Sequence, residues 1–296
     1  TSKPFISNVG SPQGDALSPI LFTVYLELAM RELRSRLVRP VEDKNIPQEI
    51  GYADDQDFIS LSNEFLNKTE EEAMNTLAHW NLHVNKTKTE RTLITRAVDE
   101  ESESWRKTKK LGTLLGDPEE VTRRRILASS ALNKATALWR GSRVAERRRI
   151  HIYNTCVKPI LTYNMGTWAL TQAESEKLDA FHRTQLRRVI NIRYPDRISN
   201  ESLYKRTGTK PISEEMYDAR WRLLGHTLRM DDKIPAKTAM LFYFNTNVKT
   251  YQGRPRTTLP IIINNDLKNI REAASKKRGR QQATIASLPT LLTSIE

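Results

Sequence analysis

Apolar side chains recur at helical spacing between Leu21 and about Leu37, near the start of the chain. Directly before this stretch, Ser18 and Pro19 are typical of a helix start, with serine as the capping residue and proline at the first helical position. A second helical repeat covers residues 70–79. The pattern therefore predicts two amphipathic helices in this part of the chain.

Two short apolar stretches, residues 50–55 and 56–61, meet at a centre rich in carboxylates and contain no proline. This arrangement predicts a β-hairpin with Asp54 and Asp55 at its apex. Residues 90–95 are a candidate for a further strand. With one strand before Gly10, the order is strand, helix, hairpin, helix and strand, which is typical of an α+β fold.

Beyond a polar connector at residues 99–110, the pattern becomes mostly helical. Asp117 followed by Pro118 and two glutamates indicates a strong helix start, because acidic residues in the first turn complement the helix dipole. Further apolar stripes cover residues 127–138, 150–161, 178–189 and 216–228. The periodicity ends at about residue 273, and we expect a mobile tail there.

The composition excludes several classes of protein. No apolar run approaches the roughly 18 residues of a membrane helix, and the N-terminal residues do not form a secretory signal. Cys156 is the single cysteine in 296 residues. One cysteine can form neither an internal disulfide nor a zinc finger. We therefore expect an intracellular protein, nuclear or cytoplasmic, that is neither secreted nor in a membrane.

The charge is distributed unevenly along the chain. It carries 48 Lys and Arg against 35 Asp and Glu, a net charge of +13. Residues 1–100 contain 11 basic and 16 acidic residues, whereas residues 101–296 contain 37 and 19. We interpret the first part as a module that holds cations or performs chemistry, and the second as one that holds phosphates. The alternative is an ordinary solvated surface with a chance imbalance.

Adjacent carboxylates on a tight turn repel each other unless a cation lies between them. Asp54 and Asp55 are therefore a candidate ligand pair for a divalent metal such as Mg²⁺, which takes carboxylate and phosphate oxygens. Two such ions can activate an attacking hydroxyl and stabilise a leaving pyrophosphate, so the chemistry would be phosphoryl or nucleotidyl transfer. From spacing alone, an exposed loop without a ligand is the alternative.

Several segments carry a family resemblance. The strings GSPQGDALSPILF at Gly10–Phe22 and YADDQDF at Tyr52–Phe58 resemble successive palm motifs of reverse transcriptases, in the variant found in non-LTR (LINE-type) retrotransposons. LHVNKTKTE at Leu82–Glu90 resembles the next palm motif, and KKLGTLLGD at Lys109–Asp117 resembles the primer-grip hairpin. Later segments resemble the thumb and post-thumb regions, up to about residue 270.

The resemblance implies an RNA-directed DNA polymerase, a nucleotidyltransferase that acts on an RNA template, a DNA primer and dNTPs with Mg²⁺ or Mn²⁺. The implied fold is an α+β partial palm followed by a mostly helical thumb and a basic helical extension. The expected domains are a partial palm at 1–98, a primer-grip hairpin and helical thumb at 99–172, a basic helical post-thumb region at 173–271 and a flexible basic tail at 272–296.

The resemblance also implies roles for individual residues. Asp54 and Asp55 would bind the catalytic metals, and Lys88 would act near the leaving pyrophosphate. The remaining implied contacts are Tyr52 and Ala53 at the turn beside the primer end, Gln13 and Gly14 along the template and the incoming nucleotide, and Leu111 and Gly112 at the primer backbone. A plain turn at Gln13–Gly14 and a solvated Lys88 are the alternatives.

Basic clusters supply candidates for phosphate contacts. Three arginines, at residues 123–125, fall in the first turn of a helix, where the helix dipole disfavours cations. The candidate arginines are Arg123, Arg124, Arg125, Arg147, Arg148, Arg149, Arg183 and Arg187. Any one of them could instead lie on a solvated face.

The sequence also departs from the family pattern. The family has a third metal-binding aspartate and a fingers region upstream of Gly10, whereas this sequence starts at Thr1. We therefore expect a fragment with little or no polymerase activity by itself. Asn81 stands where a glycine is usual, and Pro12 stands where a basic residue is frequent. The alternative function is that of a non-catalytic, nucleic-acid-binding remnant of a retroelement; a third is an intron-maturase-like role in RNA folding.

Overall fold

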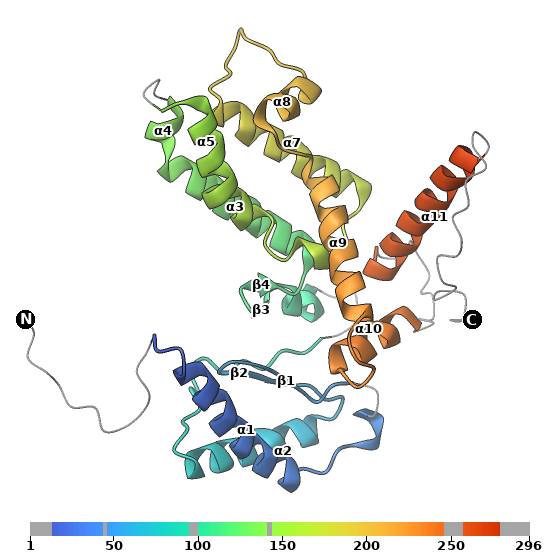
Figure 1. Cartoon of the computed structure of the whole chain (residues 1–296). Helices are drawn as coiled ribbons and strands as arrows, with labels where there is room; N and C mark the ends of the chain where they lie inside the picture. Colours follow the sequence, from blue (N-terminus) through green and yellow to red (C-terminus); the bar gives the residue numbers. More distant parts are fainter. Residues whose placement is uncertain (1–13, 44–45, 95–99, 141–143, 246–256, 279–296) are drawn as a thin grey trace, which may run out of the picture. The chain divides into compact units, whose positions relative to one another are not determined.

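The computed structural model describes residues 14–43, 46–94, 100–140, 144–245 and 257–278 (Figure 1). Over these residues the chain has an α+β fold in which helices dominate, with two small antiparallel sheets of two strands each. It divides into two compact units, Thr1–Arg91 and Thr92–Glu296. Within the described ranges, no helix is long and apolar enough to cross a membrane.

The first unit is a β-hairpin with two helices. Its main elements are α1 (Ser18–Arg36), β1 (Glu49–Tyr52), β2 (Asp55–Phe58) and α2 (Asn63–His79). Met30 and Leu33 of α1 and Ala73 of α2 form its small buried cluster, and Phe58 of the hairpin packs against it. The predicted amphipathic helices and the hairpin are thus confirmed, and the apolar cluster fixes the hairpin on the helix pair.

Both helices begin differently from the prediction. Ser18 is the first residue of α1 rather than its cap, and Leu17 occupies the cap position without a side-chain hydrogen bond. The helix α2 begins at Asn63, well before residue 70, because Ser62 caps it: the Ser62 hydroxyl accepts a hydrogen bond from the Phe65 N–H at 3.2 Å.

The candidate strand at residues 90–95 is not observed over the described residues 90–94. Side chains rather than a strand ladder hold this segment. The guanidinium of Arg91 donates hydrogen bonds to Glu70 at 2.6 Å and to Asn67 at 2.7 Å, both on α2. The prediction of a returning strand was therefore wrong at these positions.

The second unit is helical apart from one short hairpin. Its elements are a 3₁₀ segment (Glu100–Lys107), β3 (Lys109–Lys110), β4 (Thr113–Leu114), α3 (Asp117–Lys134), α4 (Thr136–Arg140), α5 (Glu146–Ile152), a π-helical turn (Tyr153–Val157), α6 (Lys158–Leu161), a 3₁₀ turn (Met165–Thr167), α7 (Gln172–Val189), α8 (Asn200–Thr207), α9 (Ile212–Leu228), α10 (Pro235–Asn245) and α11 (Leu259–Arg278). The segments predicted as thumb and post-thumb thus lie in one unit.

A large apolar core holds most of these helices together. It includes Leu132 of α3, Tyr153 of the π-helical turn, Leu186 of α7 and Ile212 of α9, all of them fully buried. Most residues of the predicted apolar stripes therefore face the interior, whereas Leu127 and Leu228 are exposed. At the start of α3, Gly116 rather than Asp117 occupies the cap position. The Asp117 carboxylate instead accepts a hydrogen bond from the Ala169 N–H at 3.0 Å.

A second cluster joins the end of the described chain to α9. Leu224 of α9 packs with Leu259 and Ile263 of α11, and the guanidinium of Arg220 donates to the Asp266 carboxylate at 2.8 Å. Helix α11 continues to Arg278, so residues 272–278 are helical rather than part of the expected flexible tail. The rest of that tail, residues 279–296, lies outside the described residues.

Candidate catalytic hairpin and nucleic-acid interface

The β1–β2 hairpin closes with a two-residue turn. Tyr52 pairs with Asp55, so that Ala53 and Asp54 form the turn. Ala53 has a φ of +54°, a left-handed conformation that is uncommon for residues other than glycine. The side-chain amide of Gln56 donates to the Ala53 carbonyl at 3.4 Å. The predicted apex is therefore shifted: Asp54 lies in the turn, whereas Asp55 is the first residue of β2.

Both aspartates are exposed. Over the described part of the chain, neither carboxylate accepts a hydrogen bond or forms an ion pair, in contrast to Asp43, which accepts the Leu61 N–H at 2.8 Å. Their oxygens are therefore free for a hard cation such as Mg²⁺. No group of three or more potential metal ligands occurs among the described residues, so Asp54 and Asp55 offer a two-carboxylate site.

Sequence reasoning missed two residues that support this turn. Gly51 pairs with Gln56 across the hairpin, and a Cβ atom on Gly51 would lie 2.7 Å from the Gln56 side-chain oxygen. A side chain at this position would therefore displace the amide that reaches the turn. The sequence signal for this support is Gly51 itself, a glycine directly before Tyr52 and opposite Gln56 in the hairpin.

Only some of the residues proposed to contact the template and the nucleotide lie within the described residues. Gln13 lies outside the described residues. Gly14 is exposed and has a φ of +95°, a conformation that favours glycine. Tyr52 is 66% exposed, so its ring is open to a partner beside the turn.

Lys88 lies in an exposed turn after α2. Its backbone N–H donates to the Asn85 carbonyl at 3.0 Å, and the Asn85 side-chain oxygen accepts the Thr87 N–H at 3.1 Å. This local bonding fixes the backbone of the turn. The Lys88 ammonium forms no ion pair with any residue that the structure describes, so it is available to a partner.

Asn81, the residue that replaces the usual glycine, has a φ of +56°. It ends α2: its N–H donates to Ala78 at 3.0 Å, and the next N–H, of Leu82, donates to Leu77 at 2.8 Å. This pattern is a Schellman motif, which requires a left-handed residue after the cap. Asparagine tolerates that conformation better than most side chains, so this departure leaves the local backbone intact.

A hairpin, β3–β4, forms at the residues that were predicted as the primer grip. Its turn residues Leu111 and Gly112 have φ values of +47° and +78°, as a two-residue turn with two left-handed positions requires. The Tyr163 hydroxyl donates to the Leu111 carbonyl at 2.8 Å. The Gly112 carbonyl accepts from Arg123 at 3.2 Å and also from Arg124. Helix α3 thus holds this turn through two of the candidate phosphate-binding arginines.

The three arginines of α3 lie beyond the first turn, so the prediction that placed them there was wrong, and the helix dipole gives no reason to assign them to phosphate. Their surroundings also differ. Arg124 is buried, pairs with the buried Glu120 and lies over the Tyr163 ring at 4.4 Å. Arg123 also contacts Glu120, at 3.1 Å. Burial opposes ionisation of Glu120, but hydrogen bonds from the Leu114 N–H and from Arg124 outweigh it and lower its pKa. Arg123 and Arg124 therefore serve the hairpin, whereas Arg125 forms no ion pair with a described residue.

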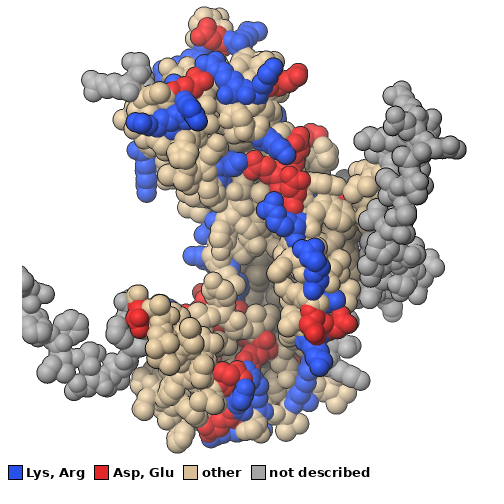
Figure 2. Space-filling model, viewed as in Figure 1, with Lys and Arg blue, Asp and Glu red and all other residues tan. Residues whose placement is uncertain are grey.

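The other candidate arginines also divide into exposed side chains and side chains that bond within the fold. Arg147 and Arg148 are exposed, whereas Arg149 is buried and donates to the Trp139 carbonyl at 3.3 Å. Arg187 donates to the Asn200 side chain at 2.8 Å, and Arg183 is partly buried. On the face of the molecule in Figure 2, Lys and Arg gather over α4, α5, α7 and α8.

Comparison with known proteins covers the first part of the chain. The family model of reverse transcriptase (RNA-dependent DNA polymerase) matches residues 1–125. This segment is therefore similar to the reverse transcriptase domain. It contains both hairpins and the first turns of α3, but less than half of the 296 residues. No curated protein and no solved structure matches the chain.

The match confirms the expected relation to reverse transcriptases over these residues, and with it an RNA-directed DNA polymerase as the activity of the family. The matched segment covers the whole first unit and the start of the second. It includes Asp54, Asp55 and Lys88 as well as Leu111 and Gly112. Most of the basic helices lie beyond it.

Proposed function

We propose that the chain is part of an RNA-directed DNA polymerase of the non-LTR retrotransposon type. The observation that carries the proposal is a pair of exposed carboxylates, Asp54 and Asp55, that have no partner among the described residues. They lie at the tip of a hairpin inside the segment that matches the reverse transcriptase family. The substrates are an RNA template, a DNA primer and dNTPs, and the second unit binds the nucleic acid through exposed arginines such as Arg147 and Arg148.

Asp54 and Asp55 would hold Mg²⁺ or Mn²⁺, since carboxylate oxygens are the ligands that these ions prefer. Such an ion, when bound, stabilises negative charge at the reacting phosphate. The chain's own residues orient the reactants: the Tyr52 ring lies beside the tip, the exposed Lys88 ammonium can donate a proton to the leaving pyrophosphate, and the β3–β4 turn supports the primer.

Two carboxylates alone make a weak metal site. We therefore propose that this chain by itself gives little synthesis. Binding of Mn²⁺, followed by electron paramagnetic resonance, tests the site directly. The double variant Asp54→Asn/Asp55→Asn should lose this binding, whereas Asp196→Asn, at an exposed aspartate of the second unit, should keep it. Equal Mn²⁺ binding by all three proteins would contradict the assignment.

Primer extension on an RNA template tests the activity. Any synthesis by the unaltered chain should disappear in Asp54→Asn/Asp55→Asn and persist in Asp196→Asn. Synthesis that survives in the double variant would exclude these aspartates as catalytic residues. If the unaltered chain binds nucleic acid but gives no product at any Mg²⁺ or Mn²⁺ concentration, the second candidate function, nucleic-acid binding without catalysis, is favoured by the basic second unit.

A further inference from the structure

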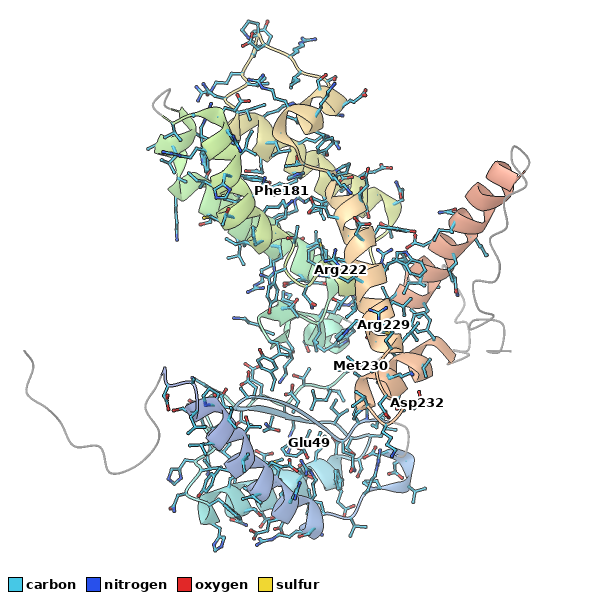
Figure 3. The ribbon with its side chains drawn as sticks, viewed as in Figure 1. Glu49, Phe181, Arg222, Arg229, Met230 and Asp232 are labelled. Carbon is cyan, nitrogen blue, oxygen red and sulfur yellow. The ribbon has the colours of Figure 1, made fainter. Side chains whose placement is uncertain are left out.

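An open hollow of about 820 Å³ lies along α3, and Phe181 of α7 also lines it. Figure 3 shows Phe181 between these two helices. The wall carries two cations, Arg125 and Lys134, and the polar side chains Ser129, Ser130 and Asn133. No carboxylate lines it. Its volume is in the range of small-ligand sites, and its lining suits an anion with an apolar part.

The cations of this hollow have no acidic partners. Neither Arg125 nor Lys134 forms an ion pair with a residue in the described part of the chain, unlike Arg124, which pairs with Glu120. The guanidinium of Arg125 lies over the Phe181 ring at 5.2 Å, and its Nε atom is buried without a hydrogen-bond acceptor. A buried donor without an acceptor is unfavourable. A phosphate oxygen in the hollow would supply that acceptor.

A second, smaller hollow of about 240 Å³ continues the same surface. It is lined by Arg188 and Arg193 together with Trp139, Ile192 and Thr136. Arg188 donates to the Asn133 side-chain oxygen at 2.7 Å, and Asn133 also lines the first hollow. This hydrogen bond therefore lies between the two hollows, which are neighbours on the surface. Their linings together contain four cations, Arg125, Lys134, Arg188 and Arg193, none of them ion-paired with a described residue.

The surrounding sequence favours a polyanion over a single small anion. Residues 121–171 contain ten Lys and Arg but a single carboxylate, Glu146. That carboxylate is engaged by Arg206, at 2.7 Å. A chain of phosphates can satisfy several separated cations at once, which an isolated phosphate cannot.

We propose that these two neighbouring hollows bind a single strand of nucleic acid, with phosphates on the four cations and unstacked bases on the apolar parts of the wall. The proposal rests on the proposed function only in that the partner is a nucleic acid. A single strand is favoured over a duplex because Phe181 and the 64% exposed Ile126 offer apolar surface. Aromatic rings and guanidinium planes pack against bases that are not paired.

Fluorescence anisotropy of the full chain with a labelled oligouridylate tests the site. The double variant Arg125→Gln/Lys134→Gln should weaken binding at least about tenfold. It should also make the slope of log K against log salt shallower by about 0.7 for each phosphate that is no longer neutralised. The matched control is Arg222→Gln/Lys205→Gln. It removes the same residue types at exposed positions on α9 and α8 that line neither hollow (Arg222 in Figure 3) and should change binding little.

Phe181→Leu separates base contacts from phosphate contacts. It keeps all four cations but removes the aromatic ring, and it should weaken binding of oligouridylate more than binding of inorganic polyphosphate. Equal loss in the test and control double variants would overturn the proposal, as would stronger binding of an RNA duplex than of the single strand. Loss of strand binding in Arg125→Gln/Lys134→Gln, in a chain that gives no DNA synthesis, would support this site while refuting the polymerase activity.

Discussion

Charged side chains of the first unit lie mostly at its surface, whereas the second unit buries several of its own. In the first unit, Asp54, Asp55 and Lys88 are exposed and have no ion-pair partner among the described residues. In the second, Arg124 and Arg149 are less than 9% exposed. These three charged groups of the first unit are therefore available for chemistry, whereas Arg124 and Arg149 of the second unit stabilise the fold.

The difference also appears within a single run of sequence. Arg123, Arg124 and Arg125 are consecutive, yet successive helix positions point about 100° apart. Arg124 faces Glu120 and the β3–β4 turn, while Arg125 faces the hollow beside Phe181. A cluster of like charges along the chain thus does not become one patch in space. Which arginine meets a phosphate depends on the helix face it occupies.

Among the variants that test this difference between the units, Glu120→Gln should have the largest effect on stability. Removing the carboxylate leaves the buried Arg124 without its counter-charge, which typically costs about 3–5 kcal/mol. Urea unfolding followed by circular dichroism should show this loss. Glu176→Gln, at an exposed glutamate of the neighbouring helix α7, is the control and should cost less than about 0.5 kcal/mol. Equal stability of the two variants would mean that Arg124 is not held by Glu120.

The ion pair of Glu120 and Arg124 also predicts how the free energy of unfolding depends on pH. The pKa of Glu120 is lowered in the folded chain, so its ionised form contributes stability above the ordinary value of 4.5. This contribution decreases as the pH falls below 4.5 towards the lowered folded pKa. The difference in free energy of unfolding between the unaltered chain and Glu120→Gln should therefore shrink below pH 4.5. A difference that stays constant down to acid unfolding would refute the ion pair.

Local signals in the sequence predicted much of this fold. Helical periodicity and Pro118 located α3, and the Asp54–Asp55 centre located the first hairpin. The spacing of Glu120 and Arg124, four residues apart, could have indicated their pairing. Their joint arrangement around the β3–β4 turn could not be predicted, because it depends on how that turn packs on the helix. For the same reason, the hollow beside Phe181 had no sequence signal.

Asn81→Ala should have a smaller effect, confined to the end of α2. Alanine in a left-handed conformation costs about 1–2 kcal/mol, whereas asparagine adopts it more readily. Asn81→Gly, which restores the usual glycine of the family, should leave stability within a few tenths of a kcal/mol or raise it slightly. Thermal unfolding of both variants measures the difference. Similar losses in alanine and glycine variants would show that the side chain of Asn81, not its backbone, matters.

Tyr163→Phe tests how the second hairpin is held, and it should cause a smaller loss of stability. The change removes the hydrogen bond to the Leu111 carbonyl but keeps the ring below Arg124. One neutral hydrogen bond contributes about 0.5–1.5 kcal/mol. Chemical unfolding should show a loss in this range, and Tyr163→Leu, which also removes the cation–π contact, should lose more. No difference between the two variants would mean that the ring does not stabilise Arg124.

Asp54→Asn should have the smallest effect on stability. Its carboxylate is exposed and has no partner among the described residues, so the change removes no interaction that stabilises the folded state. The change also removes one of two adjacent negative charges, which relieves repulsion with Asp55. The free energy of unfolding should therefore stay within about 0.5 kcal/mol of the unaltered value, while Mn²⁺ binding falls. A large loss of stability in urea unfolding would instead place Asp54 among the structural charges. The first unit would then resemble the second.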